Sequence, residues 1–187
     1  MSKPFFTIGH STRTLIAFVG LLLESRVERV VDVRSMPRSR TNPQFNGQGL
    51  AEALAAWQIG YEHIAELGGL RGRQHLGAPS PNGYWKVRSF RNYADYALTP
   101  PFAAGLARLR REGGQHRCAI MCAEALWWRC HRRIITDYLL AADEQVSHIL
   151  GPSQVVAAQL TPGAVVRADN CVVYPAPETM GVPAPPT

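Results

Sequence analysis

The chain has 187 residues, of which 46% are hydrophobic and 18% are charged, a balance typical of a globular domain with its own core. The absence of an apolar run of about 18 residues argues against a transmembrane helix. The formal net charge is +6, and 18 of the 20 basic residues are arginines. Arginine binds phosphate and carboxylate groups through paired N–H donors, so this excess favours an anionic partner, with a merely solvated basic surface as the alternative.

Neither the cysteines nor the first residues indicate an exported protein. The four cysteines are Cys118, Cys122, Cys130 and Cys171, and no Cys-x-x-Cys pair occurs. This excludes zinc-ribbon and thioredoxin-type signatures. The first residues lack a basic-then-apolar leader, so we expect a cytoplasmic protein with no membrane partner. The oligomeric state is open, and a homo-oligomer is compatible with these residues.

Buried-strand and amphipathic-helix patterns alternate along the chain. Short apolar runs predict strands over residues 5–8, 30–33, 61–64, 118–121 and 146–150. Helical spacing is present over residues 14–25, from Leu50 to Trp57, over 92–98, from Phe102 after Pro100-Pro101, and over 127–140. The order predicts a single α/β domain with a mainly parallel sheet of about five strands and flanking helices, a Rossmann-like three-layer arrangement.

The C-terminal part is less regular. An additional edge strand is expected at Val165–Val166 or Cys171–Val173. We place the domain at residues 1–173 and expect a proline-rich flexible tail over residues 174–187.

Polar residues follow four of the predicted strands. His10 and Ser11 follow the first, Arg34 follows Asp32 in the second, and His63 lies near the end of the third. Cys122 and Glu124 follow the fourth. Ligands of open α/β sheets bind beyond the carboxyl ends of the strands, so we expect these residues to line one cavity.

The turn after the fourth strand carries the strongest chemical signal. Cys130, His131 and Arg132 open the next helix, where the helix N-terminus favours anions and lowers thiol pKa values. The predicted catalytic residues are Cys122, Glu124, Cys130, His131 and His10. The predicted anion-binding residues are Ser11, Asp32, Arg34, Arg38, Arg40, His63, Arg71 and Arg132. Either thiol could instead be a small apolar filler, and Asp32 could simply pair with Arg34.

Some of these side chains are also metal-ligand types. Cys122, Cys130, His131 and His10 offer sulfur and nitrogen atoms suited to zinc or iron. Their spacing matches no common metal signature. We therefore predict no metal ligands and assign no cofactor.

Several of these segments resemble the domain-of-unknown-function family 488. The resemblance rests on Thr7–Ser11, Asp32–Arg34 with Pro37–Arg40 and Phe45, Leu67–Gly69 with Arg71, Phe90–Tyr96, Met121–Glu124 and Cys130–Arg132, in this order. Members of that family are small bacterial and archaeal cytosolic proteins without a settled activity, so the resemblance implies a site rather than a reaction. The chain departs from the family pattern at Ala125–Arg129, where two tryptophans replace a polar turn. Rhodaneses also place Asp-Val-Arg and a later cysteine at strand ends, an analogy of fold only.

The residues favour an enzyme that acts on an anionic substrate, either a phosphate-bearing small molecule, a nucleotide or a nucleic-acid-derived group. Cys122 or Cys130 would be the nucleophile. One alternative is a nucleic-acid-binding module without catalysis, in which loop aromatics stack on bases, namely Phe45, Tyr84, Trp85 and Phe90. Another is a redox-sensitive binding protein with a reversible Cys122–Cys130 disulfide.

Overall fold

The computed structural model describes residues 3–177 and contains one six-stranded sheet in the order β3-β2-β4-β1-β5-β6. The strands are β1 (Phe5–Gly9), β2 (Arg29–Asp32), β3 (Gly60–His63), β4 (Cys118–Cys122), β5 (Val146–Gly151) and β6 (Gln154–Ala157). The first five are parallel, and β6 runs antiparallel to β5 at the edge. The predicted α/β class and mainly parallel sheet are confirmed.

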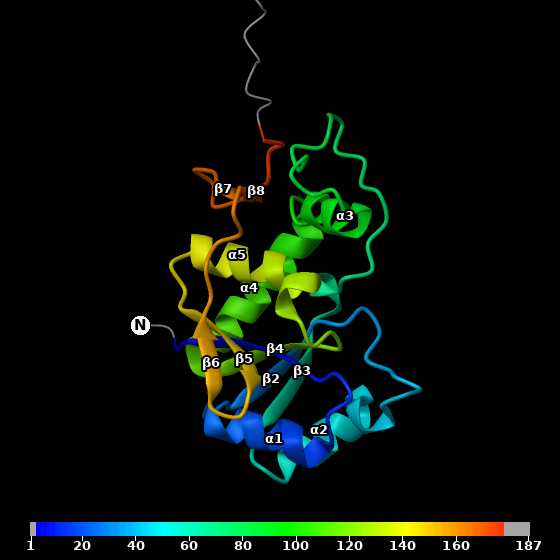
Figure 1. Ribbon diagram of the computed structural model, residues 1–187, viewed down its shortest axis with the longest axis vertical. Coiled ribbons are helices and arrows are strands. Elements are labelled where there is room, and N and C mark those ends of the chain that lie inside the picture. Colours follow the sequence, from blue (N-terminus) through cyan, green and yellow to red (C-terminus); the bar gives the residue numbers. More distant parts are fainter. Residues whose placement is uncertain (1–2, 178–187) are drawn as a thin grey trace, which may run out of the picture.

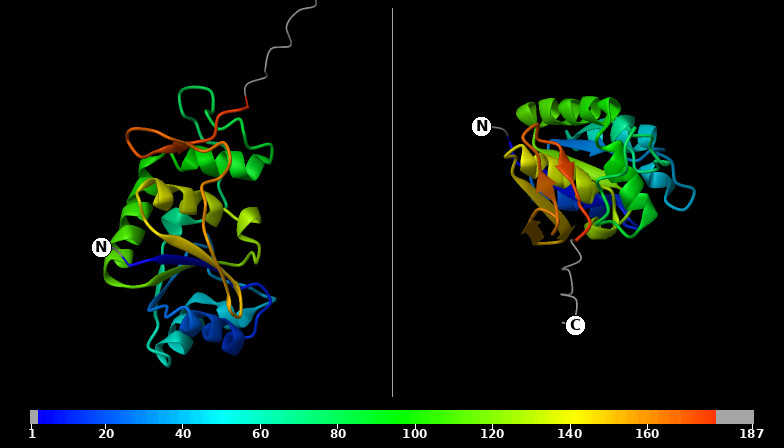
Figure 2. Two further views of the ribbon diagram at one scale, coloured as in Figure 1. Left: turned by 60° about the vertical axis from the view of Figure 1, so that its left-hand side comes forward. Right: turned by 90° about the horizontal axis from the view of Figure 1, so that it is seen from above.

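Helices cover both faces of the sheet, which gives three layers (Figures 1 and 2). One face carries α1 (Leu15–Glu24) and α2 (Gly47–Ala55), and the other carries α4 (Pro100–Gln115) and α5 (Arg132–Ala141), with α3 (Arg88–Tyr96) lying beyond them, farther from the sheet. Three 3-10 turns lie in the connections, η1 (Pro43–Phe45), η2 (Ala65–Leu67) and η3 (Trp127–Arg129). No helix in the described part of the chain is both long and apolar enough to cross a membrane.

The sheet separates two apolar cores. Phe18, Leu22 and Leu50 belong to the core under α1 and α2, and Phe102 and Ile134 belong to the core under α4 and α5. All residues of β1 and β4 are buried, as expected for central strands covered on both faces. Their sequences are therefore continuous apolar runs, which is why they could be predicted.

The C-terminal strands differ from the prediction. Strands are present at both expected places, but β7 (Val165–Val166) and β8 (Val172–Val173) pair with each other in a separate two-stranded sheet and do not extend the main sheet. The edge position belongs to β6, whose residues are all exposed. A two-residue apolar run does not identify its pairing partner, and β6 lacks the buried pattern that marks the other strands.

Ordered packing continues past the predicted domain boundary at residue 173. Tyr174 is fully buried, and its hydroxyl donates a hydrogen bond of 2.8 Å to Asp137. Residues 178–187 of the predicted tail lie outside the described residues.

Two helices begin at other residues than the sequence predicts. The helix expected over 127–140 begins only at Arg132, because η3 and the extended Cys130 precede it. The helix expected from residue 92 begins at Arg88, and α4 carries Pro100 and Pro101 in its first turn, where proline leaves no intrahelical hydrogen bond unmade. The late start of α5 decides where Cys130 lies.

Candidate active site

A cavity of about 760 Å³ lies at the carboxyl ends of β1, β2 and β4. Eight of the predicted site residues line it, His10, Ser11, Arg34, Arg38, Cys122, Glu124, Cys130 and His131. The parallel register explains their meeting, because Gly9 pairs with Cys122 and Asp32 pairs with Met121. The strand-end prediction therefore brought together residues from three separate parts of the chain.

Five predicted residues do not line the cavity. Arg40 is exposed on the loop before η1. Arg71 donates to the carbonyls of Ala65 and Gly68 and stacks 3.9 Å over the ring of Tyr96. The other three do not face the cavity but bind residues that line it. Asp32 and His63 bind Arg34, and Arg132 binds Cys130.

Asp32 fixes Arg34. The carboxylate is fully buried and accepts bonds from Nε and Nη2 of Arg34 at 2.9 and 2.6 Å, and from the hydroxyl of Tyr61 at 2.7 Å. The aspartate raises the pKa of Arg34 against the opposing effect of burial. His63 also holds the backbone of Arg34, because its Nε2 donates to the Arg34 carbonyl at 2.8 Å. The orientation of the Arg34 guanidinium toward the cavity is therefore fixed by these contacts.

His10 also supports Arg34. Its Nδ1 lies 2.9 Å from the Ser11 carbonyl, which only accepts, so Nδ1 carries the proton and Nε2 is free to accept from Arg34 Nη1 at 3.2 Å. Burial lowers the pKa of His10, which keeps the ring neutral beside the arginine. The ring stacks on Phe45 with centroids 4.3 Å apart. This geometry makes His10 a positioning residue for Arg34.

A thiol–thiol–imidazole cluster forms the reactive part of the cavity. The sulfur atoms of Cys122 and Cys130 and a ring nitrogen of His131 lie within 4.8 Å of one another. Nε2 of His131 donates to the Val33 carbonyl at 2.8 Å, which leaves Nδ1 directed at Cys130 Sγ at 3.6 Å. The imidazole is therefore oriented to take the proton of Cys130.

Arg132 supplies the charge for this cluster. Its side chain is 1% exposed, and its Nε donates to Cys130 Sγ at 3.3 Å while Nη2 donates to the Glu124 carbonyl. Within residues 3–177, no carboxylate forms a salt bridge with it. A buried guanidinium is stabilised by a counter-charge, and the Cys130 sulfur is the titratable group that it contacts.

The pKa values of the two thiols are shifted in opposite directions. A hydrogen bond from Cys122 lowers the pKa of Cys130 well below its usual value, with the positive charges of His131 and Arg132 acting in the same direction. The same bond, together with burial, raises the pKa of Cys122. These shifts favour a thiolate at Cys130 over one at Cys122.

The chain matches the family model described as "Domain of unknown function DUF488" over residues 14–139. This chain belongs to the DUF488 family. No curated protein and no solved structure matches it.

Two glycines of this DUF488 domain shape the site. A β-carbon on Gly9 would overlap the Glu124 carbonyl, so glycine at the end of β1 allows the loop after β4 to approach. A β-carbon on Gly69 would overlap Nδ1 of His131. The Leu67-Gly68-Gly69 segment therefore leaves room for the imidazole. The sequence could not show this role, because His131 lies far from Gly69 along the chain.

The same cluster contains three potential metal ligands. Cys122, Cys130 and His131 could together bind a soft divalent ion such as zinc, and the Nε2 bond to Val33 is the kind of outer contact that orients a metal-bound histidine. Their spacing in the sequence did not indicate this, because Cys122 and Cys130 are joined through η3 rather than by a tight loop.

Several lining residues were not predicted as site residues. Tyr93 of α3 lines the cavity, and the centroid of its ring lies 5.0 Å from that of His131. Phe90, which was expected only as a base-stacking loop aromatic of the binding-module alternative, also lines the cavity, but it lies on α3 rather than in a loop. Met36, Asn42 and Leu70 also line it. The long loops that carry Met36, Asn42 and Leu70 were the available signal, since such loops inside compact domains are often functional.

Proposed function

We propose that this DUF488 domain is an enzyme that acts on an anionic, phosphate-bearing substrate with Cys130 as the nucleophile. The observation that carries the proposal is the buried Arg132, whose Nε contacts Cys130 Sγ and which has no carboxylate partner within residues 3–177. Keeping such a charge away from water is costly unless an anion compensates it. A thiolate at Cys130 compensates it and is also the reactive form of cysteine.

The remaining roles follow from the contacts. His131 takes the Cys130 proton at Nδ1, and Val33 holds the ring in the required orientation. In the covalent step Sγ of Cys130 bonds to phosphorus, the bond from phosphorus to the leaving oxygen breaks, and that oxygen takes the proton held by His131. Water then hydrolyses the sulfur–phosphorus bond. Arg34 faces the phosphate as an electrostatic contact.

Alkylation of the chelator-treated protein tests the nucleophile. Iodoacetamide should modify Cys130 before the other cysteines and at a pH well below that of an ordinary thiol, as followed by mass spectrometry of the peptides. Cys122→Ala should shift the Cys130 profile to higher pH, whereas Cys122→Ser should restore much of the donor hydrogen bond. Inorganic phosphate should slow alkylation. An ordinary alkaline profile for Cys130 would contradict the proposal.

A second candidate is a metal-dependent enzyme. It is favoured by the three ligand atoms within 4.8 Å of one another, which leave a fourth position for water or substrate in a tetrahedral site. Cobalt(II) added to the reduced protein would then produce thiolate-to-cobalt absorption that both Cys122→Ser and Cys130→Ser weaken. Cys171→Ser is the matched control, because Cys171 lies outside the cluster. Absence of that absorption leaves the thiolate mechanism as the account of this site.

A further inference from the structure

We propose that the cavity is a mononucleotide site, with an aromatic zone for the base, a neutral polar zone for the sugar and a cationic zone for the phosphate. This inference rests on the proposed function, because it identifies the substrate class of the same cavity. Three independent sets of lining residues support it, and each set matches one part of a nucleotide.

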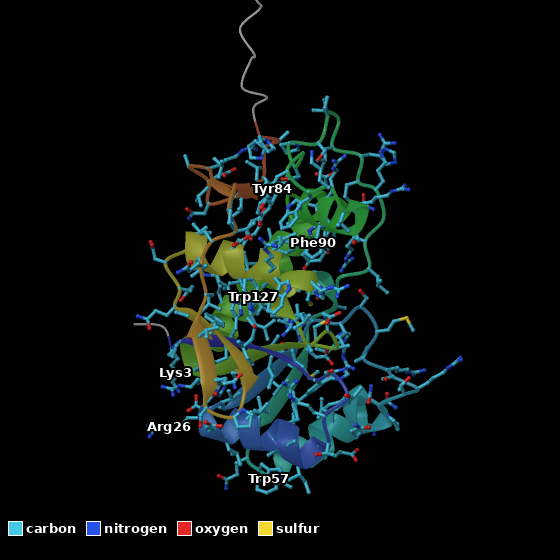
Figure 3. All side chains as sticks on the ribbon, in the orientation of Figure 1. Lys3, Arg26, Trp57, Tyr84, Phe90 and Trp127 are labelled. Carbon is cyan, nitrogen blue, oxygen red and sulfur yellow. The ribbon has the colours of Figure 1, made fainter. Side chains whose placement is uncertain are left out.

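The aromatic zone is built on Phe90. Trp85 stacks on this ring with centroids 4.9 Å apart and an interplanar angle of 17°, and the Arg133 guanidinium lies 5.0 Å from the Trp85 ring. Phe90 is therefore fixed from one side while it lines the cavity. It lies on α3 (Figure 3), three residues before Tyr93 and thus on the same helix face, and the ring centroid of Tyr93 lies 5.0 Å from that of His131 in the reactive cluster. Such a supported ring is suited to stack on a base.

Two exposed apolar residues add hydrophobic surface to the cavity. Leu70 is 82% exposed and Met36 is 66% exposed, yet both line the cavity. Ligand cavities are commonly lined by apolar and aromatic side chains with a few polar groups that set orientation. An inorganic anion alone would leave these apolar side chains in water, whereas a planar base would cover them.

The cationic zone consists of Arg34, Arg38 and Arg129. Glu124 is the one carboxylate among the described lining residues, so the cavity favours an anion. Nη1 of Arg34 bonds only to His10 among the described contacts, which leaves a second N–H on that nitrogen for a phosphate oxygen.

Neutral polar side chains make up the third zone. Ser35, Ser39, Asn42 and Ser89 line the cavity. Within residues 3–177, the side chains of Asn42 and Ser89 make no hydrogen bond, and only the backbone N–H of Asn42 is bonded, to Ser39, so both side chains are available to sugar hydroxyls. A phosphorylated tyrosine carries a ring and a phosphate but no such hydroxyls, and the observations therefore favour a nucleotide over a phosphopeptide.

The test compares two ligands of equal charge on the full chain. We expect adenosine 5′-monophosphate to bind at least about tenfold more tightly than ribose 5-phosphate in calorimetry, because only the former stacks on Phe90. Phe90→Ala should remove this ratio without weakening ribose 5-phosphate, and Phe90→Trp should keep it. Trp57→Ala is the matched control, since Trp57 is half exposed on the far side of the molecule (Figure 3).

The outcomes separate this inference from the proposed function. Equal binding of the two ligands, a ratio that survives Phe90→Ala, or binding of O-phosphotyrosine as tight as that of the nucleotide would each overturn the nucleotide site. None of these results would alter the low-pH alkylation of Cys130, which tests the chemistry. Repeating the titration with Cys130→Ser keeps any turnover from affecting the measured affinity.

Discussion

The two ends of β4 carry the same residue type in opposite surroundings. Cys118 at the amino end is fully buried, and burial raises its pKa to about 12. Cys122 at the carboxyl end meets Cys130, whose pKa is lowered. The arginines near the two cysteines also differ in their burial and in their ion-pair partners. Near Cys118, Arg29 is a quarter exposed and paired with Glu62 and Glu112, whereas Arg132 near Cys122 is buried without a carboxylate.

This difference shows what marks the functional end of the sheet. Ion pairs in partial contact with water, such as those of Arg29, contribute little free energy. A buried cation without a carboxylate is costly, and the fold retains it only where a second charge, here a thiolate or a ligand, faces it.

The largest expected effect is on thiol reactivity. At pH 7 the alkylation rate of Cys130 should exceed that of Cys118 by more than about a thousandfold, because the fraction of thiolate follows the pKa. Peptide mass spectrometry after timed alkylation gives both rates in one sample. Comparable alkylation rates of Cys130 and Cys118 would show that the two ends of β4 do not differ in thiol reactivity.

The next effect concerns the two arginines. Arg132→Met should lower the free energy of unfolding by about 3 kcal/mol, because it leaves the Cys130 group without its buried partner. Arg29→Met should cost about 1 kcal/mol or less. Urea unfolding at pH 7 measures both. The same Arg132 variant should shift Cys130 alkylation to higher pH, while Arg29→Met should not.

A third prediction concerns the pH dependence of stability. Burial, together with the charge of Arg132, lowers the pKa of His148 from 6.5 to about 4. Between these values the unfolded chain binds a proton that the folded chain excludes, so the free energy of unfolding falls as the pH falls. The His148 contribution should be about 2 kcal/mol between pH 6.5 and 5.

Variants isolate this contribution. His148→Gln should flatten the pH dependence of urea unfolding by that amount, and His75→Gln, at an exposed histidine, should leave it unchanged. An unchanged slope in His148→Gln would show that other groups cause the acid sensitivity.

The smallest effect concerns Gly69. Gly69→Ala should displace His131, lower the free energy of unfolding by about 1 kcal/mol and slow Cys130 alkylation severalfold. Gly72→Ala is the control, because a β-carbon there meets no atom within 4 Å. If the two variants alkylate at the same rate, His131 does not assist Cys130.

Much of the site followed from the sequence because strand ends and helix starts are local features. The apolar runs of β1, β2 and β4 located His10, Arg34 and Cys122, and parallel pairing brought them to one edge. Arg71 and Arg40 could not be separated from Arg38 in this way. All three are loop arginines, and only the path of the loop decides which of them faces the cavity.

By itself, the sequence determined the α/β class, the strand-end cluster and the thiol–imidazole–arginine turn, since each depends on periodicity or neighbouring residues. Only the tertiary structure decided that Cys130 contacts Arg132 and His131, that His10 supports Arg34 and that Phe90 lines the cavity. Those properties depend on which groups from distant segments lie within hydrogen-bonding or stacking distance, and on how far water is excluded from them. The local sequence pattern determines neither the distances between groups from distant segments nor the exclusion of water from them.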